Sequence, residues 1–487
     1  MQLPALDTAI VVAYLLGMLG VGLWVSRRIG GFKDFFVAGG RMTTPILVCT
    51  LVSTYYGLDV TFGTSETAYK EGVAAFFAYS APFYVAYLAM ALLVAPRLRR
   101  IPALSLPEAM GHFYGRGARL GGAFGSFVYS APILGVSGMG WIGETFFGLA
   151  FHEGAMLGAG IALVYTVLGG LLADAVTDTV QFTVMCVTVA IAAIYALGDN
   201  AGPSGLEASG RLPPETFEPF GGLSLAEICV YGSVALTPLV EPAFYQRTFA
   251  AKGSRAIIKA LVIGVGLWIA YDWLVVYLGI TAQDLVARGE LDAEGMESGA
   301  IMLRAMQELL PTGLLGLFLA GCLASAMSTL DSYALIAAGN LVYDGWEGVT
   351  GRKLEDRTLL WTTRLLTVLT TAGCVWVALQ FESMRGAWIF MATVLLSTAF
   401  VPMLAALFFL RARRPLAGTL SAWTGLVASL SSTIAFFAWG TEVDGEVSME
   451  VLGRTWIREQ AVLVAVPLSI GAFAAGYTLD RLRENRS

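Results

Sequence analysis

The chain has 487 residues, of which 56% are hydrophobic and 14% are charged, and its formal net charge is −6. Soluble domains carry roughly 25% charged residues, so this composition excludes an ordinary soluble protein. Apolar runs of about 20 residues, the length that spans a bilayer, recur along the whole sequence. We therefore expect an all-α polytopic membrane protein.

The first apolar run starts at Leu6 and ends near Val25, with an acidic residue at its head and two arginines behind it. A cleaved signal peptide would instead have a positively charged start and small residues at a cleavage site. We therefore expect residues 1–42 to form a retained leading helix followed by a cytoplasmic segment.

Glycine, proline and charged residues divide the rest of the sequence into further apolar runs, which gives thirteen spans in total. An odd number of spans places the two termini on opposite sides. Most of the 30 Lys and Arg residues fall in alternate connecting segments, and such segments are cytoplasmic under the positive-inside rule. We therefore expect the N-terminus outside and the C-terminus inside. The spans are expected to begin near residues 6, 43, 73, 118, 154, 174, 223, 255, 312, 358, 386, 416 and 460.

The second span contains STYYGLDVTFGTSETAY, residues 53–69, in which Gly57 and Gly63 bracket Asp59. Glycine weakens a helix interior, so this span is expected to be interrupted. Irregular backbone at membrane depth is tolerated only where protein or water satisfies its polar groups. A buried acid at that depth indicates a functional site.

The seventh span, CVYGSVALTPLVEPAFYQR, is interrupted in a similar way, because Pro238 and Pro242 flank Glu241. Each proline removes a helix hydrogen bond and clashes with the preceding turn. The two interruptions would also arise if these were simple kinks that bind no ligand.

The positions of the interrupted helices divide the chain into two similar halves. Each interrupted helix is the first of five consecutive helices. The first set of five covers residues 43–197 and the second covers 223–411, and an extracellular loop at 198–222 separates them. This arrangement is typical of an inverted-repeat transporter with a binding site near the middle of the membrane. Residues 412–487 add two peripheral helices.

The ninth span, GLLGLFLAGCLASAMSTLDSYALIAAGNLVYDGW, carries four hydroxyl residues on one helical face. Na⁺ is a hard cation that prefers oxygen ligands. Two adjacent hydroxyls of this face, with carbonyls freed by the interrupted second span, would supply several of them. Serine and threonine also serve as packing residues between membrane helices, so the spacing alone leaves that alternative open. The four residues are Ser325, Ser328, Thr329 and Ser332.

Several of these segments resemble the sodium:solute symporter family. AMSTLDS at 326–332 resembles the sodium-coordinating motif of that family. Three other stretches resemble further family elements, and the matches run in order from about residue 6 to 415. They are FKDFFVAGGR (32–41), GGLLADAVTDTVQF (169–182) and FYQRTFAAK (244–252).

The resemblance implies a LeuT-like fold, in which a 5+5 inverted-repeat core carries one extra N-terminal and two extra C-terminal helices. It implies that Ser328 and Thr329 bind Na⁺ through their side chains and Ser325 through its carbonyl. Ser53 and Tyr56 are then expected to contribute carbonyls from the interrupted second span.

Asp178 matches an acidic residue that is tied to ion coupling in the family. The alternative is a helix N-cap, since Thr177 and Asp178 are expected to open a span on the cytoplasmic side.

The solute is expected beside the two interruptions, so Tyr55, Asp59 and Glu241 are the first candidate ligands. Trp141 and Glu144, in the fourth span, are further candidates. Within the family the sequence most resembles the high-affinity choline transporters, with proline symporters as another relative. It departs from both, because Tyr55 and Glu241 stand where those choline transporters carry two cage tryptophans. Relative to proline symporters, the acidic residue is displaced to Asp59.

These observations predict a sodium-coupled symporter of the plasma membrane, in bacteria the inner membrane, that imports a small organic solute. Two carboxylates near one buried site favour a solute with an amine or a quaternary ammonium. A sugar or carboxylate symporter stays an alternative. A symporter-like membrane sensor is another, although the chain ends at RLRENRS, which leaves no room for a signalling domain. We expect no enzyme activity, no nucleic-acid binding and no obligate protein partner; the expected partners are Na⁺, the solute and the lipid bilayer.

Overall fold

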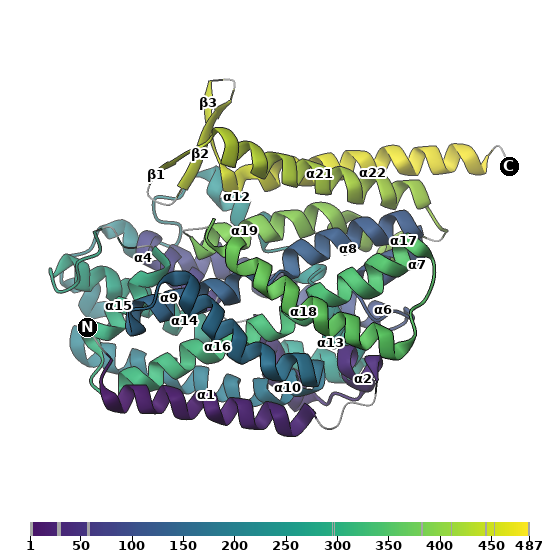
Figure 1. Cartoon of the computed structure of the whole chain (residues 1–487). Helices are drawn as coiled ribbons and strands as arrows, with labels where there is room; N and C mark the ends of the chain where they lie inside the picture. Colours follow the sequence, from purple (N-terminus) through teal and green to yellow (C-terminus); the bar gives the residue numbers. More distant parts are fainter. Residues whose placement is uncertain are drawn as a thin grey trace.

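The computed structural model of the chain describes residues 3–26, 31–55, 59–294, 296, 298–380, 383–410, 412–443, 446–451 and 453–485. Within them the chain forms a helical bundle with one small sheet (Figure 1). Eleven helices are long and apolar enough to cross a membrane, and a bent pair adds a twelfth. A shorter apolar helix, Phe151–Val164, lies where another span was expected. The all-α prediction is confirmed, whereas the count of thirteen spans and their orientation stay predictions.

The first half of the described chain runs through the first interrupted helix to one very long helix. Short 3₁₀ and π-helical turns, marked η, separate several of its α-helices. The elements are α1 (Ala5–Ser26), α2 (Phe32–Val37), η1 (Ala38–Gly40), α3 (Thr44–Tyr55), η2 (Asp59–Thr64), α4 (Ser65–Glu71), η3 (Ala75–Ser80), α5 (Ala81–Ala89), η4 (Met90–Val94), α6 (Ala95–Leu98), α7 (Leu106–Tyr114), α8 (Arg116–Ser130), α9 (Ile133–Phe147), α10 (Phe151–Asn200), α11 (Gly202–Ala208) and η5 (Pro214–Phe217).

The second half starts with the second interrupted helix and ends with two trailing helices. The elements are α12 (Leu225–Val234), η6 (Thr237–Leu239), α13 (Pro242–Ala250), α14 (Ser254–Ala287), α15 (Ser298–Leu309), α16 (Leu314–Gly339), η7 (Asn340–Trp346), α17 (Glu347–Thr350), α18 (Asp356–Ala378), α19 (Met384–Leu395), η8 (Leu396–Phe400), α20 (Val401–Phe408), α21 (Pro415–Trp439), β1 (Thr441–Val443), β2 (Glu446–Val451), β3 (Arg454–Ile457), η9 (Arg458–Ala461) and α22 (Val462–Glu484).

Both predicted interruptions are present. The predicted second span bends by 49° between α3 and the helix that continues to Glu71. The predicted seventh span breaks between α12 and α13, where Glu241 is the N-cap and Pro242 follows at the first helical position. Proline is favoured there because its missing N–H would have no helical partner in any case. Both helices are therefore interrupted where their glycine and proline residues predict it.

The predicted fifth and sixth spans form a single 50-residue helix, α10, with a kink at Gly170. Gly170 has a φ of 51°, and a Cβ there would lie 2.4 Å from the carbonyl oxygen of Phe35. Asp178 lies two turns beyond this kink, inside the helix and fully buried. The N-cap alternative for Asp178 is therefore wrong, because the helix does not begin at that residue.

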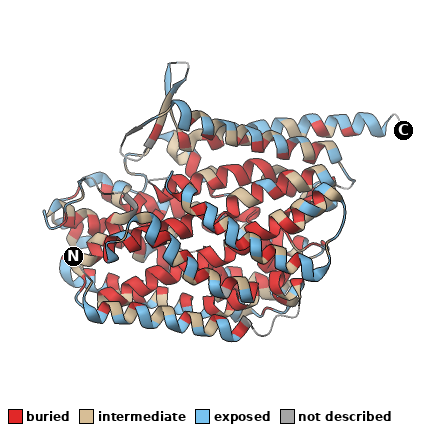
Figure 2. Cartoon of the chain, in the orientation of Figure 1, coloured by how far each residue is buried: buried red, intermediate tan, exposed pale blue. Residues whose placement is uncertain are grey.

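Helix α16 forms the centre of the bundle. In the span Leu314–Thr350, which begins with this helix, 89% of an apolar stretch of 18 residues is buried. Helix α16 packs against α1, α3, α8, α9, α10 and α18. Burial is concentrated around this centre, while the outward faces of α1, α21 and α22 are exposed (Figure 2). Those faces carry large apolar side chains, including Leu16 and Phe437. Such a surface suits contact with lipid.

A three-stranded antiparallel sheet in the order β1-β2-β3 connects α21 to α22. Thr441 pairs with Ser448, and Ser448 pairs with Ile457. The sequence predicts only two peripheral helices over residues 412–487 and no strands between them.

Candidate functional site

The end of α3 meets the hydroxyl face of α16. The Ser328 hydroxyl donates a hydrogen bond to the Ser53 carbonyl at 2.8 Å, and the Thr329 hydroxyl donates to the Thr54 carbonyl at 3.2 Å. The last four carbonyls of a helix have no partner within it. The interruption after Tyr55 thus supplies acceptor oxygens at the place where α16 presents hydroxyls.

Five oxygen atoms gather at this junction, and they fit a dehydrated Na⁺. The Ser328 hydroxyl also lies 3.3 Å from the Ser325 carbonyl, which adds a third carbonyl to the two from α3. Hard cations bind carbonyl and hydroxyl oxygens of this kind. A bound cation would require both hydroxyls to turn their lone pairs inward. The oxygens belong to Ser53, Thr54, Ser325, Ser328 and Thr329.

The structure thus brings together four of the five residues predicted to bind sodium and adds Thr54. The fifth, Tyr56, lies outside the described residues. The side chain of Ser325 points elsewhere, with its hydroxyl 3.2 Å from that of Thr61 in η2. This is consistent with a contribution from its carbonyl alone.

One helical turn from this junction lies a fully buried charge cluster around Arg247 of α13. Its Nη2 atom lies 3.2 Å from Asp174 Oδ2 and 3.8 Å from Asp178 Oδ2. Arg247 and Asp178 have no exposed surface and Asp174 has 1%. Burying charges is costly unless they are paired and hydrogen-bonded.

Three hydroxyl groups complete this cluster, which we call the Arg247 cluster. Arg247 Nη2 donates to Thr50, Thr54 and Ser332 at 3.0, 2.8 and 2.6 Å. The Ser332 hydroxyl donates in turn to Asp174 at 2.7 Å. Since Thr54 also gives its carbonyl to Thr329, the cluster and the sodium candidate share one residue. Asp178 therefore lies close to the predicted ion path.

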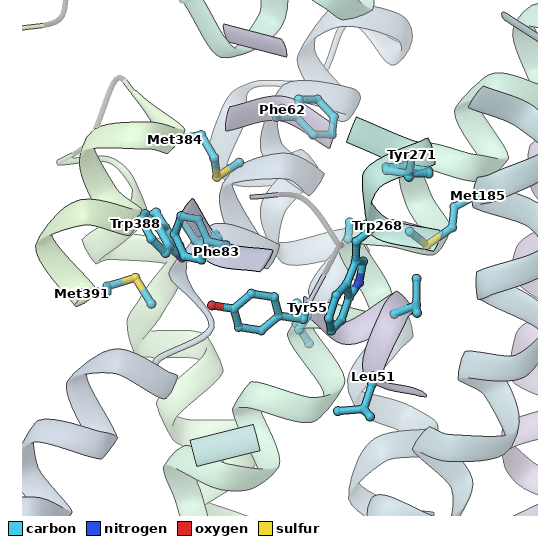
Figure 3. Packing of buried hydrophobic residues seen from close by; sticks show 14 of the residues in the cluster. Leu51, Tyr55, Phe62, Phe83, Met185, Trp268, Tyr271, Met384, Trp388 and Met391 are labelled. Carbon is cyan, nitrogen blue, oxygen red and sulfur yellow. The ribbon is translucent and has the colours of Figure 1, made fainter. Parts of the chain in front are cut away.

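Tyr55, the last residue of α3, sits in a group of aromatic rings. Its ring centroid is 4.7 Å from Phe244, 5.4 Å from Tyr87 and 6.3 Å from Trp268. Its hydroxyl points toward Phe83 and Trp388 (Figure 3). The predicted solute residue Tyr55 is therefore buried between the two interrupted helices.

A small cavity of about 20 Å³ adjoins Tyr55 and includes a carboxylate that the sequence analysis did not identify. This is Asp272, fully buried in the middle of α14. Tyr84 of α5 donates a hydrogen bond to its Oδ2 atom. The residues around the cavity are Tyr55, Val60, Thr64, Tyr79, Ser80, Phe83, Tyr87, Asp272 and Trp388.

Trp388 also lines a second cavity of about 10 Å³, which Thr329 and Tyr333 border. Tyr333 donates a hydrogen bond to Glu241 at 2.9 Å, and Glu241 accepts another from the Phe244 N–H at 2.9 Å. Glu241 thus caps α13 and connects it to α16. Trp388 therefore borders both the cavity beside Tyr55 and the cavity beside Thr329 of the sodium candidate.

The remaining candidates lie elsewhere. Trp141 is buried in α9 against Phe62, with ring centroids 6.3 Å apart. Glu144, one turn further along α9, is exposed. The structure does not bring either residue to the Tyr55 cavity. The side chain of Asp59 lies outside the described residues, although its backbone begins η2.

The sequence matches the model of the sodium:solute symporter family over residues 35–425. Sodium/proline symporter 2 of Staphylococcus saprophyticus is 25% identical over 392 residues, covering 76% of this chain and 74% of that protein. A sodium/proline symporter of Haemophilus influenzae is 25% identical over 409 residues, covering 77% of each protein. Among solved structures, a Na⁺-coupled sialic acid symporter superposes with a TM-score of 0.76 over 98% of both chains, at 14% identity.

The likeness to that solved structure extends over nearly the whole of both chains. It confirms the predicted LeuT-like architecture.

Proposed function

Since the chain belongs to the sodium:solute symporter family, we propose that it imports a small organic solute by sodium-coupled symport through alternating access. The junction of α3 and α16 carries the proposal, because Ser328 and Thr329 meet the carbonyls of Ser53 and Thr54 there. An enzymatic role is set aside, as the relatives are transporters.

Na⁺ entering from outside would join the interrupted α3 to α16 at these oxygens. The solute then binds between the two interruptions, beside Tyr55, and the bundle rocks to open inward. Ser328 and Thr329 lie toward the predicted inner exit, so Na⁺ would leave first. Each positive charge that moves inward gains about 2.3 kcal/mol per 100 mV of membrane potential.

The solute we favour carries an amine or a quaternary ammonium. Relatives named as sodium/proline symporters support this class, and proline is a secondary amine. The multi-pass protein then belongs in the plasma membrane, which in the bacteria of those relatives is the inner membrane.

The first test replaces the two hydroxyls. Ser328→Ala with Thr329→Ala is expected to abolish binding of radioactive sodium to the purified protein, because both side-chain ligands are lost. Sodium-dependent counterflow in proteoliposomes should disappear as well, while the protein stays monodisperse in detergent. Undiminished sodium binding in this double variant would contradict the assignment of the site.

Ser325→Ala is the matched control on the same helix face. Its carbonyl remains, and its hydroxyl contacts Thr61 rather than the carbonyls of α3. Sodium binding should therefore persist. A loss as large as that of the double variant would mean that general packing of α16, and not ligation by two hydroxyls, controls sodium binding.

A further inference from the structure

The middle of α14 places a carboxylate beside the first interrupted helix. α14 packs against α3, η2 and α4, and so it covers both sides of the break. Tyr271 fixes its position, because its hydroxyl lies 2.9 Å from that of Thr61 in η2. Asp272 follows directly and is fully buried. An ionisable residue at this depth of a membrane protein is a functional-site candidate.

The surroundings of Asp272 are mostly aromatic. Five of the nine residues that line its cavity are Tyr, Phe or Trp. These rings contact one another across elements, as in Tyr55–Tyr87 at 5.4 Å and Phe83–Trp388 at 5.5 Å. Trp268 lies one turn before Asp272 on α14, and its ring centroid is 4.2 Å from that of Tyr87. Ring faces attract organic cations, and they do so more strongly when water is excluded.

The cavity is closed in this structure. Its volume of about 20 Å³ is about that of one water molecule. A solute therefore enters only when the rings of Tyr55, Phe83 and Trp388 separate. These rings come from three different elements, α3, α5 and α19, so movement of the bundle opens and closes the space.

The chemistry of this lining selects the charge of the solute. A buried carboxylate repels an anionic group and attracts an ammonium, and the rings reinforce the attraction. Thr64 and Ser80 also line the cavity, and their hydroxyls are suited to bind a polar part of the solute. Tyr84 holds one carboxylate oxygen of Asp272 in place by its hydrogen bond.

We propose that Asp272 binds the ammonium group of the transported solute within the aromatic cavity beside Tyr55, and that Tyr84 is its positioning residue. This inference rests on the proposed sodium symport. Under this proposal the ammonium group contacts Asp272 and not Glu241. The carboxylate of Glu241 instead caps α13 and accepts a hydrogen bond from the Tyr333 hydroxyl.

Thermal unfolding of the purified full chain in detergent tests the inference. The probes are L-proline, ethanolamine, choline and glycine betaine, each added in NaCl and in KCl. Their isosteres, in which a carbon replaces the charged nitrogen, are cyclopentanecarboxylate for proline, 1-propanol for ethanolamine, 3,3-dimethylbutanol for choline and 3,3-dimethylbutanoate for glycine betaine. D-glucose and acetate represent the other solute classes. At least one ammonium compound should raise the melting temperature in Na⁺, and its isostere should not.

The variant Asp272→Asn should weaken the apparent affinity for that compound at least about tenfold, the usual loss for a hydrogen bond to a charged group. Asp272→Glu should keep part of it. Tyr84→Phe should weaken binding less and leave the preference for the ammonium over its isostere unchanged. Stabilisation by Na⁺ alone should persist in all three.

Asp284→Asn is the matched control, because Asp284 is also a buried carboxylate of α14. Its partners are Arg211 at 2.7 Å and Arg288 at 3.3 Å, away from the aromatic cavity. This variant should lose stability but keep the wild-type response to the ammonium compound.

The assignment of Asp272 would be overturned if Asp272→Asn bound the ammonium compound with unchanged affinity. It would also be overturned if the wild type responded to no ammonium compound, or if it responded equally to the isosteres. The comparison of isosteres uses the wild type alone, so it decides the matter even if Asp272→Asn does not fold. A wild type whose melting temperature ignores Na⁺ would instead contradict the proposed sodium symport itself.

Discussion

Arg247 carries its positive charge into the centre of the bundle without solvent exposure. It extends from α13, directly after the second interruption, to Thr50 and Thr54 of α3. Its carboxylate partner Asp174 lies on α10. One side chain therefore ties both interrupted helices to the helix that bears Asp178.

Removing this guanidinium leaves Asp174 and Asp178 buried without their cation. Breaking a buried ion pair in this way costs about 3–5 kcal/mol. We therefore expect Arg247→Gln to lower the free energy of unfolding by about this amount, measured by denaturant titration in detergent micelles. Adding Asp174→Asn should recover part of the loss, because one uncompensated charge is then removed.

The control for this prediction is Arg41→Gln. Arg41 pairs with Asp34 at 3.0 Å, but its side chain is 75% exposed. Exposed pairs contribute about 1 kcal/mol or less. An equal decrease in the free energy of unfolding for Arg41→Gln and Arg247→Gln would show that the buried ion pairs of Arg247 stabilise the protein no more than an exposed pair.

Single residues were predicted from the sequence where a helical period or a family motif marked them. Ser328 and Thr329 stand on one face of an apolar helix, and the Ser328 hydroxyl meets the predicted carbonyl of Ser53. Asp174 and Arg247 both lie in the quoted motifs, yet no local pattern indicates that residues 73 positions apart pair. Asp272 is a lone acid in an apolar run, and only its aromatic neighbours from other helices give it a role.

Among the elements, the kink in α10 depends on a single glycine, Gly170. Gly170 bends this helix between the two spans predicted from the sequence, and the carbonyl of Phe35 in α2 packs into the space that a side chain would fill. The kink therefore lets the short helix α2 pack closely against α10.

Gly170→Ala is expected to destabilise the protein. The backbone strain alone costs about 1–3 kcal/mol, and the contact of 2.4 Å with Phe35 adds to it. Gly160→Ala on the same helix is the control, since its Cβ would meet no heavy atom within 4 Å. Alanine there is expected to be neutral or to stabilise by up to about 1 kcal/mol. Equal unfolding transitions for the two variants would contradict the assigned role of the kink.

The helices were easier to predict than the sheet. Long apolar runs and proline or glycine breaks are strong local signals, so the interrupted spans were found at their correct places. The strands β1 to β3 are short, and their alternation of Val447, Met449 and Val451 with polar residues lies within an acidic stretch. The Asp-Gly pair at 444–445 was the signal that would have indicated a hairpin.

At the scale of the whole molecule, ion pairs gather in two layers. Arg119 with Asp344 and Arg414 with Glu484 join segments that the charge distribution predicts to be cytoplasmic. Pairs formed by Arg211, Arg288 and Arg385 join segments predicted to be outside. Each of these pairs thus connects residues that the sequence assigns to the same side, and the choice of which side is cytoplasmic stays a prediction.

Arg385 of α19 links three elements in the predicted outer layer. Its Nη1 atom lies 2.6 Å from Glu71 of α4 and 2.8 Å from the hydroxyl of Tyr231 in α12. At the opposite side, a cavity of about 460 Å³ lies between α2, α7 and the end of α13. The Arg385 contacts therefore act as a candidate outer gate.

Opening this gate tests both the orientation and alternating access. In a chain whose five cysteines are replaced, Ser80→Cys places a thiol in the lining of the solute cavity. Adding Arg385→Ala should increase its labelling by a membrane-impermeant maleimide, applied from outside, at least about tenfold. A tenfold shift needs only about 1.4 kcal/mol, which is less than the cost of breaking a buried ion pair.

Arg211→Ala serves as the control for the gate. Its partner Asp284 belongs to the same outer layer, but this pair does not join α4, α12 and α19. Labelling should therefore stay at the level of the parent. Labelling that rises only from the inner side would contradict the predicted orientation, because the Arg385 contacts would then close the inner entrance. An unchanged rate from both sides would mean that α19 is held by its apolar packing, and that the rings around Trp388 rather than Arg385 limit access to the cavity.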